Sequence, residues 1–389
     1  MHTILLILTG GTIGSVDNKG VIDVPDCATQ SFCDISAGSV SCGVGAPISS
    51  CDISAGSASC GVGATVSSCD VSSGSASCDI ESCVLTEKYY ANNSTKDVVF
   101  KIRRPLNILS ENMNPAYWND IVMTIIRDSY DCDGVIIAHG SDTLTYTSAA
   151  MAWIFKGIDK PIVLTAANHP LEASNTNGVV NFCACVDYIC NKANSKINGV
   201  YTIYQDNNSR VNVYNSATIC EADGYLDEYH DQTGEAYGYM VDGMFIKNES
   251  YCPPILPYVI GNEQNLNPEL IREQLMQGTR MMDNVLFIRP YPGMRYDNIS
   301  FDNNKPACVL HWLYHAGTAS TESYRESNSL LGFISRCKKE QIPVYIGSVK
   351  CSEESVYASH RELIDGGAKS LYDINQESAY AYLVLKYMG

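Results

Sequence analysis

Short apolar runs alternate along the chain with longer segments whose apolar residues recur at helical spacing. The runs predict strands at Thr3–Thr9, Gly134–Ala138, Pro161–Thr165 and Val200–Tyr204. The longer segments predict helices at Tyr117–Ser129, Thr143–Phe155 and Val179–Asn191. Short apolar strands separated by helices of this length indicate an α/β fold, with helices on both faces of a parallel sheet.

The pattern loosens between residues 217 and 282, where Asp242–Gly243 predicts a hairpin turn. Alternation then resumes, with strands predicted at Asn284–Ile288, Ala307–Leu310 and Pro343–Ile346 and helices at Ser327–Lys339 and Ser378–Lys386. We therefore expect an N-terminal α/β domain at residues 1–216, a linker region at 217–282 and a smaller α/β domain at 283–389.

The net charge of the chain excludes some classes of binding partner. The 389 residues carry a formal net charge of −17, which argues against binding to nucleic acid or to anionic membranes, because both need a basic surface. The apolar run after Met1 has no preceding Lys or Arg and stops at Gly10, too early for a signal peptide or a membrane span. We expect a cytoplasmic protein with reduced thiols.

Six of the 17 cysteines lie nine residues apart, at Cys33, Cys42, Cys51, Cys60, Cys69 and Cys78. This fixed period indicates tandem units, which look like an insert at residues 27–83. The units are small and polar, so each can bury little surface. Three interpretations stay open: a surface loop, a stack of β-turn units, or a metal site, although the spacing is not that of a zinc ribbon.

Two loops that follow predicted strands carry polar residues with catalytic potential. In the segment from Thr9 to Gly14, the paired glycines let the backbone approach a ligand, and their amides can stabilise an oxyanion. Thr12 is a potential nucleophile there, although a structural turn explains the glycines equally well. No Gly-Lys-Ser/Thr follows, so the segment is not a phosphate loop.

The second loop is His139-Gly140-Ser141-Asp142-Thr143. Asp142 can cap the following helix or bind a substrate ammonium. The proximity of His139 to Ser141 in the sequence does not supply the geometry of a Ser–His–Asp triad. A third loop, Asp159-Lys160-Pro161, leads into a predicted strand. A lysine there is typical of a solvated flank, whereas one that points into the cleft beside other charges has a lowered pKa and can act as a base.

Together these motifs resemble the bacterial-type L-asparaginase family. The resemblance rests on Thr-Gly-Gly-Thr-Ile-Gly at 9–14, His-Gly-Ser-Asp-Thr at 139–143 and Lys-Pro-Ile-Val at 160–163. It continues through Leu109–Met113 and covers the chain apart from the cysteine repeat. It implies a larger parallel-sheet sandwich domain, a smaller flavodoxin-like α/β domain, and hydrolysis of L-asparagine to aspartate and ammonia. The cytoplasmic (type I) branch and a homodimer or homotetramer are also implied.

The resemblance assigns a role to each matching residue. Thr12 matches the acylating nucleophile, and Ser141, Asp142 and Lys160 match a hydroxyl–carboxylate–lysine set that assists proton transfer. Ser110 and Glu111 match the pair that binds the α-carboxylate and α-ammonium of the substrate. The backbone at Gly11 and at Gly140–Ser141 matches the oxyanion site. The implied chemistry uses neither a metal nor a cofactor.

The sequence also departs from the family pattern. Ser141 stands where the family usually has threonine. The tyrosine expected after the first motif aligns near Val21, and Tyr89 or Tyr90 is a possible substitute. Alternatives are a glutaminase-asparaginase, favoured by Glu111, and a non-catalytic amino-acid sensor. A third, the amidase component of a tRNA-dependent amidotransferase, is disfavoured by the acidic charge and by the position of the first strand.

Overall fold

The computed structural model describes residues 1–14, 83–92, 97–191, 197–226, 228–252, 266–322, 326–349 and 357–389. At residue 12, and in the short strands β2 (Val16–Asn18), β3 (Val21–Asp23) and β4 (Cys78–Ile80), it describes the backbone alone. The cysteine repeat lies outside the described residues, except for the backbone of Cys78 in β4.

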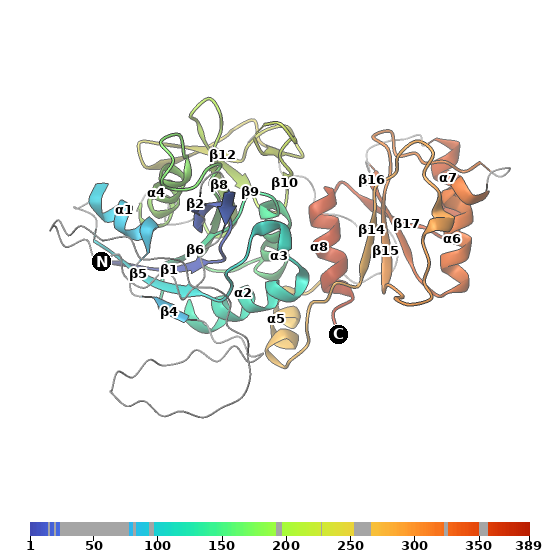
Figure 1. The fold of residues 1–389 in the computed structure, drawn as a ribbon, viewed down its shortest axis with the longest axis horizontal. Helices are drawn as coiled ribbons and strands as arrows, with labels where there is room; N and C mark the ends of the chain where they lie inside the picture. The colour runs from blue at the N-terminus through green and yellow to red at the C-terminus, as the bar shows by residue number, and fades with distance from the viewer. Residues whose placement is uncertain are drawn as a thin grey trace, which may run out of the picture. The chain divides into compact units, whose positions relative to one another are not determined.

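The larger sheet has nine strands and forms the centre of the fold (Figure 1). In spatial order they are β13 (Met244–Lys247), β12 (Gly238–Val241), β9 (Val211–Asn215), β8 (Gly199–Gln205), β7 (Pro161–Thr165), β6 (Gly134–Ala138), β1 (His2–Leu8), β5 (Val98–Arg104) and β4. The run from β8 to β5 is parallel, whereas β9, β12, β13 and β4 pair antiparallel with their neighbours.

Both faces of this sheet are buried, as its parallel centre requires. Alternate residues of β1 point to opposite faces, so Leu5 and Ile7 join one core cluster while Ile4 and Leu6 join another. The first cluster is covered by α2 (Pro115–Asp128) and α3 (Leu144–Ile154), and the second by α1 (Val84–Asn92) and α4 (Gly178–Cys190).

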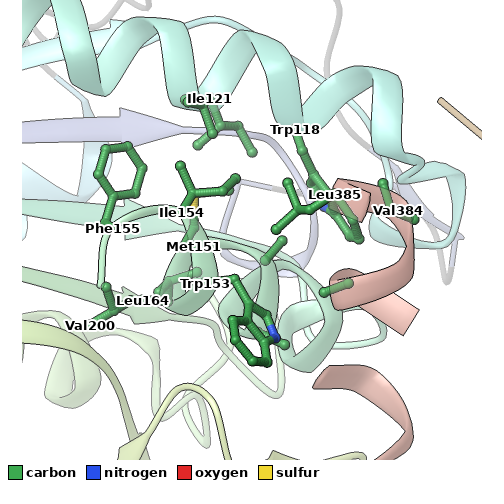
Figure 2. Close-up of a cluster of buried hydrophobic side chains, with 14 of the residues drawn as sticks. Trp118, Ile121, Met151, Trp153, Ile154, Phe155, Leu164, Val200, Val384 and Leu385 are labelled. Carbon is green, nitrogen blue, oxygen red and sulfur yellow. The ribbon is translucent and has the colours of Figure 1, made fainter. Parts of the chain in front are cut away.

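The smaller sheet is entirely parallel, in the order β14 (Val285–Ile288), β15 (Cys308–Trp312), β16 (Val344–Val349) and β17 (Lys369–Tyr372). Helices α6 (Leu330–Lys339) and α7 (Ala358–Asp365) cover one face, and α8 (Gln376–Lys386) covers the other. Helix α8 also packs on α3, where the Trp153 indole donates to the backbone and hydroxyl of Ser378. Val384 and Leu385 complete this apolar contact (Figure 2).

The predicted strands and helices are present, with ends that shift by at most three residues. Asp242 and Gly243 both have positive φ and turn β12 into β13, but this hairpin extends the larger sheet. The sequence did not predict β5, β9, α1, α5 (Pro268–Met276), α7 or β17. Among the described residues, no helix combines the length and apolar character needed to cross a membrane.

Candidate active site

Three loops meet at the carboxyl edge of the larger sheet. They follow β1, β5 and β6, which are neighbours in the order β6-β1-β5. The chain passes from β1 to β5 on one side and then crosses to β6 on the other, so β1 marks a topological switch point. Ligands of open α/β sheets bind at such points, beyond the carboxyl ends of the strands.

Glycines allow the three loops to approach closely. Gly10 and Gly11 have φ of 94° and 70°, and the Gly11 amide donates to the Ile108 carbonyl at 2.8 Å. A Cβ atom on Gly11 would lie 2.3 Å from the Cα of Gly140, and one on Gly140 would lie 2.4 Å from the Cβ of Ser110. A side chain at either glycine would therefore force the loops apart. We call this junction the glycine junction.

A hydrogen-bond pair ties the loop after β5 to the loop after β6. The Ser110 hydroxyl, which is buried, donates to Oδ2 of Asp142 at 2.7 Å. In return the Thr143 hydroxyl donates to the Ser110 carbonyl at 2.8 Å. Asp142 itself is exposed, and so is Glu111 beside Ser110. Two solvent-accessible carboxylates thus flank the glycine junction, which is an arrangement suited to an ammonium group.

His139 is a structural residue in this arrangement. Its Nδ1 lies 2.8 Å from the Gly140 carbonyl, which can only accept, so Nδ1 carries the proton. Its Nε2 then accepts from the Thr147 hydroxyl at 3.0 Å, and that hydroxyl accepts from the Trp118 indole. Burial lowers the pKa of His139 to about 4, so the ring is neutral at pH 7. Both nitrogens are engaged, so His139 does not serve as a base for Ser141.

Tyr229 contacts the candidate site, and the sequence did not predict this contact. Its hydroxyl donates to the Ser141 carbonyl at 2.7 Å, across 88 residues of chain. The ring is buried and meets Tyr204 edge-on, with centroids 4.8 Å apart. Thr143 was likewise missed as a link to Ser110. Motif spacing could not reveal either contact, because each depends on how distant loops pack.

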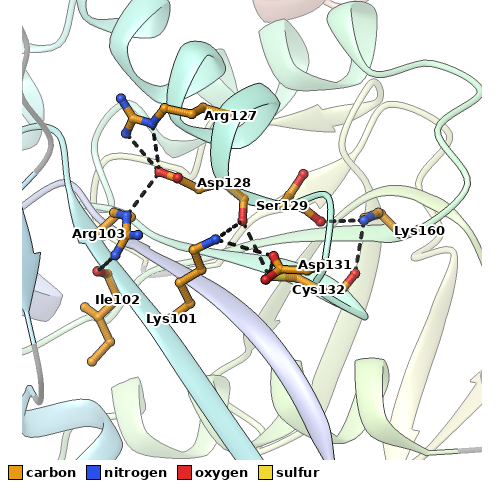
Figure 3. A network of polar contacts seen from close by, with 9 residues as sticks. All are labelled: Lys101, Ile102, Arg103, Arg127, Asp128, Ser129, Asp131, Cys132 and Lys160. Carbon is orange, nitrogen blue, oxygen red and sulfur yellow. Dashed lines mark hydrogen bonds and ion pairs between the residues drawn. The ribbon is translucent and has the colours of Figure 1, made fainter.

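Lys160 does not lie at this site, so its assignment from the family resemblance is wrong. Its Nζ donates to the carbonyls of Ser129 at 2.6 Å and Cys132 at 3.0 Å, in the loop that leads into β6 (Figure 3). Lys160 precedes β7, and β6 and β7 are parallel, so it lies at the amino edge. At about 3.3 Å per residue, a five-residue strand separates it from the glycine junction by roughly 15 Å.

The other predictions concern Thr12 and the tyrosine expected near Val21. Thr12 begins a 3-10 turn over Thr12–Gly14, closed by the Gly14 amide on the Gly11 carbonyl at 2.9 Å, but its side chain lies outside the described residues. The Val21 side chain does too. Of its possible substitutes, Tyr89 is buried in the core against Phe100. The Tyr90 hydroxyl donates to the Val98 carbonyl, at the amino end of β5.

Comparison with models of protein families shows the family to which the chain belongs. Residues 3–222 match the model of the N-terminal domain of asparaginases, which is more than half of the sequence. The chain belongs to the asparaginase family. The match includes all three loops of the glycine junction.

Curated relatives in this family include a glutamyl-tRNA(Gln) amidotransferase component from Methanosphaera stadtmanae, 28% identical over 76% of this chain and 62% of the relative. The same component from Methanobrevibacter smithii is 27% identical over 73% of this chain and 61% of the relative. The chain therefore spans about three fifths of the length of these relatives.

Solved structures of asparaginases share the fold. The thermostable L-asparaginase from Thermococcus kodakarensis matches with a TM-score of 0.63 at 17% identity, over 98% of this chain and 92% of that one. L-asparaginase I from Vibrio cholerae matches with a TM-score of 0.62 at 18% identity, over 100% of this chain and 94% of that one. The arrangement of a large mixed sheet and a small parallel sheet is thus the asparaginase fold.

Proposed function

We propose that the protein is an L-asparaginase, which hydrolyses the side-chain carboxamide of L-asparagine to aspartate and ammonia. The observation that carries the proposal is the glycine junction, where the loop bearing Thr12 meets the Ser110–Asp142 hydrogen bond at the switch point of the sheet. Family membership supports amide hydrolysis as the reaction class.

In the proposed reaction, the Thr12 hydroxyl attacks the carboxamide carbon, its proton passes to the carboxamide nitrogen, and the C–N bond then breaks. The backbone amide of Ser141 stabilises the resulting oxyanion, whereas the Gly11 amide, which the family resemblance matches to the same site, already donates to the Ile108 carbonyl at 2.8 Å. Ammonia leaves, and water then hydrolyses the acyl-enzyme. The exposed carboxylates of Asp142 and Glu111 bind the α-ammonium of the substrate. Because His139 is neutral and engaged, it contributes to the shape of the site rather than to proton transfer.

Ser110 positions the Asp142 carboxylate in the proposed reaction. Its hydroxyl is committed to Asp142, so it orients that carboxylate toward the substrate ammonium. We assign the α-carboxylate of the substrate to backbone donors of the same loops. Lys160 has no part in the mechanism, because it lies at the opposite edge of the sheet. A cytoplasmic location and a homo-oligomeric state remain predictions from the family resemblance.

A second candidate is a glutaminase that supplies ammonia to a tRNA-dependent amidotransferase. Curated relatives favour it, because those from Methanosphaera stadtmanae and Methanobrevibacter smithii, which match over most of this chain, are components of glutamyl-tRNA(Gln) amidotransferases. The two candidates share the nucleophile and the oxyanion site, and they differ in whether glutamine is the better substrate and whether a partner is required.

The test is ammonia release from L-asparagine and from L-glutamine, measured separately for the wild type, Thr12→Ala and Thr12→Ser. Release from asparagine that falls by about three orders of magnitude or more in Thr12→Ala, and recovers partly in Thr12→Ser, supports the proposal. Higher kcat/KM for glutamine favours the second candidate. Folded protein whose thermal midpoint rises with asparagine, but which releases no ammonia, would replace both with a binding protein.

A further inference from the structure

Tyr229 reaches the candidate active site from a part of the chain to which neither the motifs nor the proposed mechanism assigns a role. It precedes β11 (His230–Asp231), which pairs with β10 (Ile219–Cys220) in a separate two-stranded sheet. Its hydroxyl makes the contact, as donor to the Ser141 carbonyl at 2.7 Å. The contact therefore couples this small sheet directly to the loop that carries Ser141 and Asp142.

The tyrosine is held on several sides, so its hydroxyl has a fixed place. The ring is 7% exposed and packs edge-on against Tyr204 at an angle of 89°. Its own backbone carbonyl accepts from the Tyr214 hydroxyl at 2.9 Å. The nearby Asp231 is buried and accepts hydrogen bonds from the hydroxyls of Thr218 and Thr233. A rigid donor of this kind restrains its acceptor.

The restrained acceptor is the carbonyl of the Ser141–Asp142 peptide unit, next to the Gly140–Ser141 unit whose amide is assigned to the oxyanion. Asp142 and Thr143 tie the loop after β6 to Ser110 on one side. Within the loop, the Leu144 amide also donates to the Ser141 carbonyl, at the longer distance of 3.4 Å, and His139 Nδ1 donates to the Gly140 carbonyl. Tyr229 contacts the loop at a different atom and from a different element. The loop is thus held from both directions, with Ser141 between the two supports.

We infer that Tyr229 is a positioning residue for the proposed amidohydrolase reaction. It fixes the Ser141 carbonyl and thereby the orientation of the Ser141 side chain and of the adjacent peptide groups. Asp142 keeps its own support from Ser110, so substrate binding depends less on Tyr229 than turnover does. The inference rests on the proposed function for its kinetic test, but its structural part is independent of that function.

The kinetic test compares Tyr229→Phe with Tyr90→Phe. Each change deletes one tyrosine hydroxyl that donates to a backbone carbonyl, at 2.7 Å and 2.9 Å respectively, but Tyr90 lies at the opposite edge of the sheet. We expect Tyr229→Phe to lower kcat about tenfold with KM changed by less than about threefold. Tyr90→Phe should keep both constants within about twofold. Equal effects of the two variants would overturn the inference.

A second measurement does not require activity. Amide hydrogen exchange of residues 140–143 should accelerate in Tyr229→Phe by about threefold or more, while that of β1 stays unchanged. The thermal midpoint of Tyr229→Phe should stay within about 5 °C of the wild type. If exchange at residues 140–143 does not change, Tyr229 does not position the loop. If exchange changes but the wild type releases no ammonia, the positioning stands and the proposed function fails.

Discussion

The two edges of the larger sheet differ in what holds their loops together. At the carboxyl edge, glycines bring three loops into contact, and the neutral hydroxyls of Ser110, Thr143 and Tyr229 supply the side-chain hydrogen bonds to other loops. Around the end of α2, near the amino edge, charged groups dominate: Lys101 and Lys160 donate to backbone carbonyls, and Asp128 pairs with Arg127 and with Arg103, which comes from near the carboxyl end of β5 (Figure 3).

Helix direction explains the difference. Helix α2 ends at the amino edge, where its last carbonyls lack intrahelical partners and attract cations. Lys101 donates to the Asp128 carbonyl at 3.0 Å, and Lys160 donates to that of Ser129 next to it. Helix α3 instead begins at the carboxyl edge, where the positive end of its dipole favours anionic groups such as Asp142 and a developing oxyanion. A lysine in a motif therefore need not belong to the site.

Among variants that distinguish the two edges, Asp142→Asn at the carboxyl edge is expected to have the largest effect on activity. Removing this charge should lower kcat/KM for asparagine by about 10²–10³-fold, because the substrate ammonium loses an ionic partner while the side-chain shape is kept. Ammonia release measures the loss. Circular dichroism and the thermal midpoint should stay close to the wild type, since Asp142 is exposed. A loss of less than about threefold would remove Asp142 from the proposed mechanism.

Gly11→Ala should have the next largest effect, here on stability. A Cβ at Gly11 meets Gly140 at 2.3 Å, and the residue has φ of 70°. Backbone strain and overpacking together should lower the free energy of unfolding by about 3 kcal/mol. The control is Gly157→Ala, which has φ of 79° but no atom within 4 Å of its Cβ, and should cost about 1 kcal/mol. Equal losses in urea unfolding would contradict the close packing of the loops.

Asp128→Asn should destabilise the amino edge by about 2 kcal/mol and leave KM unchanged. Burial acts to raise the pKa of Asp128, but hydrogen bonds from Arg127 and Arg103 outweigh it and hold that pKa below its usual range. The stabilising charge is therefore fully present above about pH 4 and is lost as pH falls through the lowered pKa. Urea unfolding at about pH 7 and pH 3 should show the difference from the wild type shrinking at the lower pH.

The smallest effect is expected from Lys160→Met. The change removes two hydrogen bonds to carbonyls from a half-buried side chain, so unfolding should become easier by less than about 1 kcal/mol. Ammonia release should stay within about twofold of the wild type. A loss of more than about a hundredfold, with the fold intact by circular dichroism, would restore Lys160 to the mechanism and contradict the separation of the two edges.

The sequence by itself determined the fold class, four strands at the centre of the larger sheet (β1, β6, β7 and β8) and the turn between β12 and β13. Apolar runs such as Gly134–Ala138 are buried on both faces, so their local pattern is unambiguous. It also located the loops at 9–14 and 139–143, because motifs that follow strands lie at one edge of a parallel sheet. It missed β5, whose residues are mostly only partly buried and include Lys101, Arg103 and Arg104.

The tertiary structure alone decided which polar groups meet. Ser110 and Asp142 are 32 residues apart, and Tyr229 and Ser141 are 88 apart, so neither hydrogen bond has a local signal. Strand direction removed Lys160 from the site, although its motif resembles that of the family. Local patterns fix elements because burial repeats with the period of a helix or strand, whereas side-chain partners depend on loop packing, which has no period.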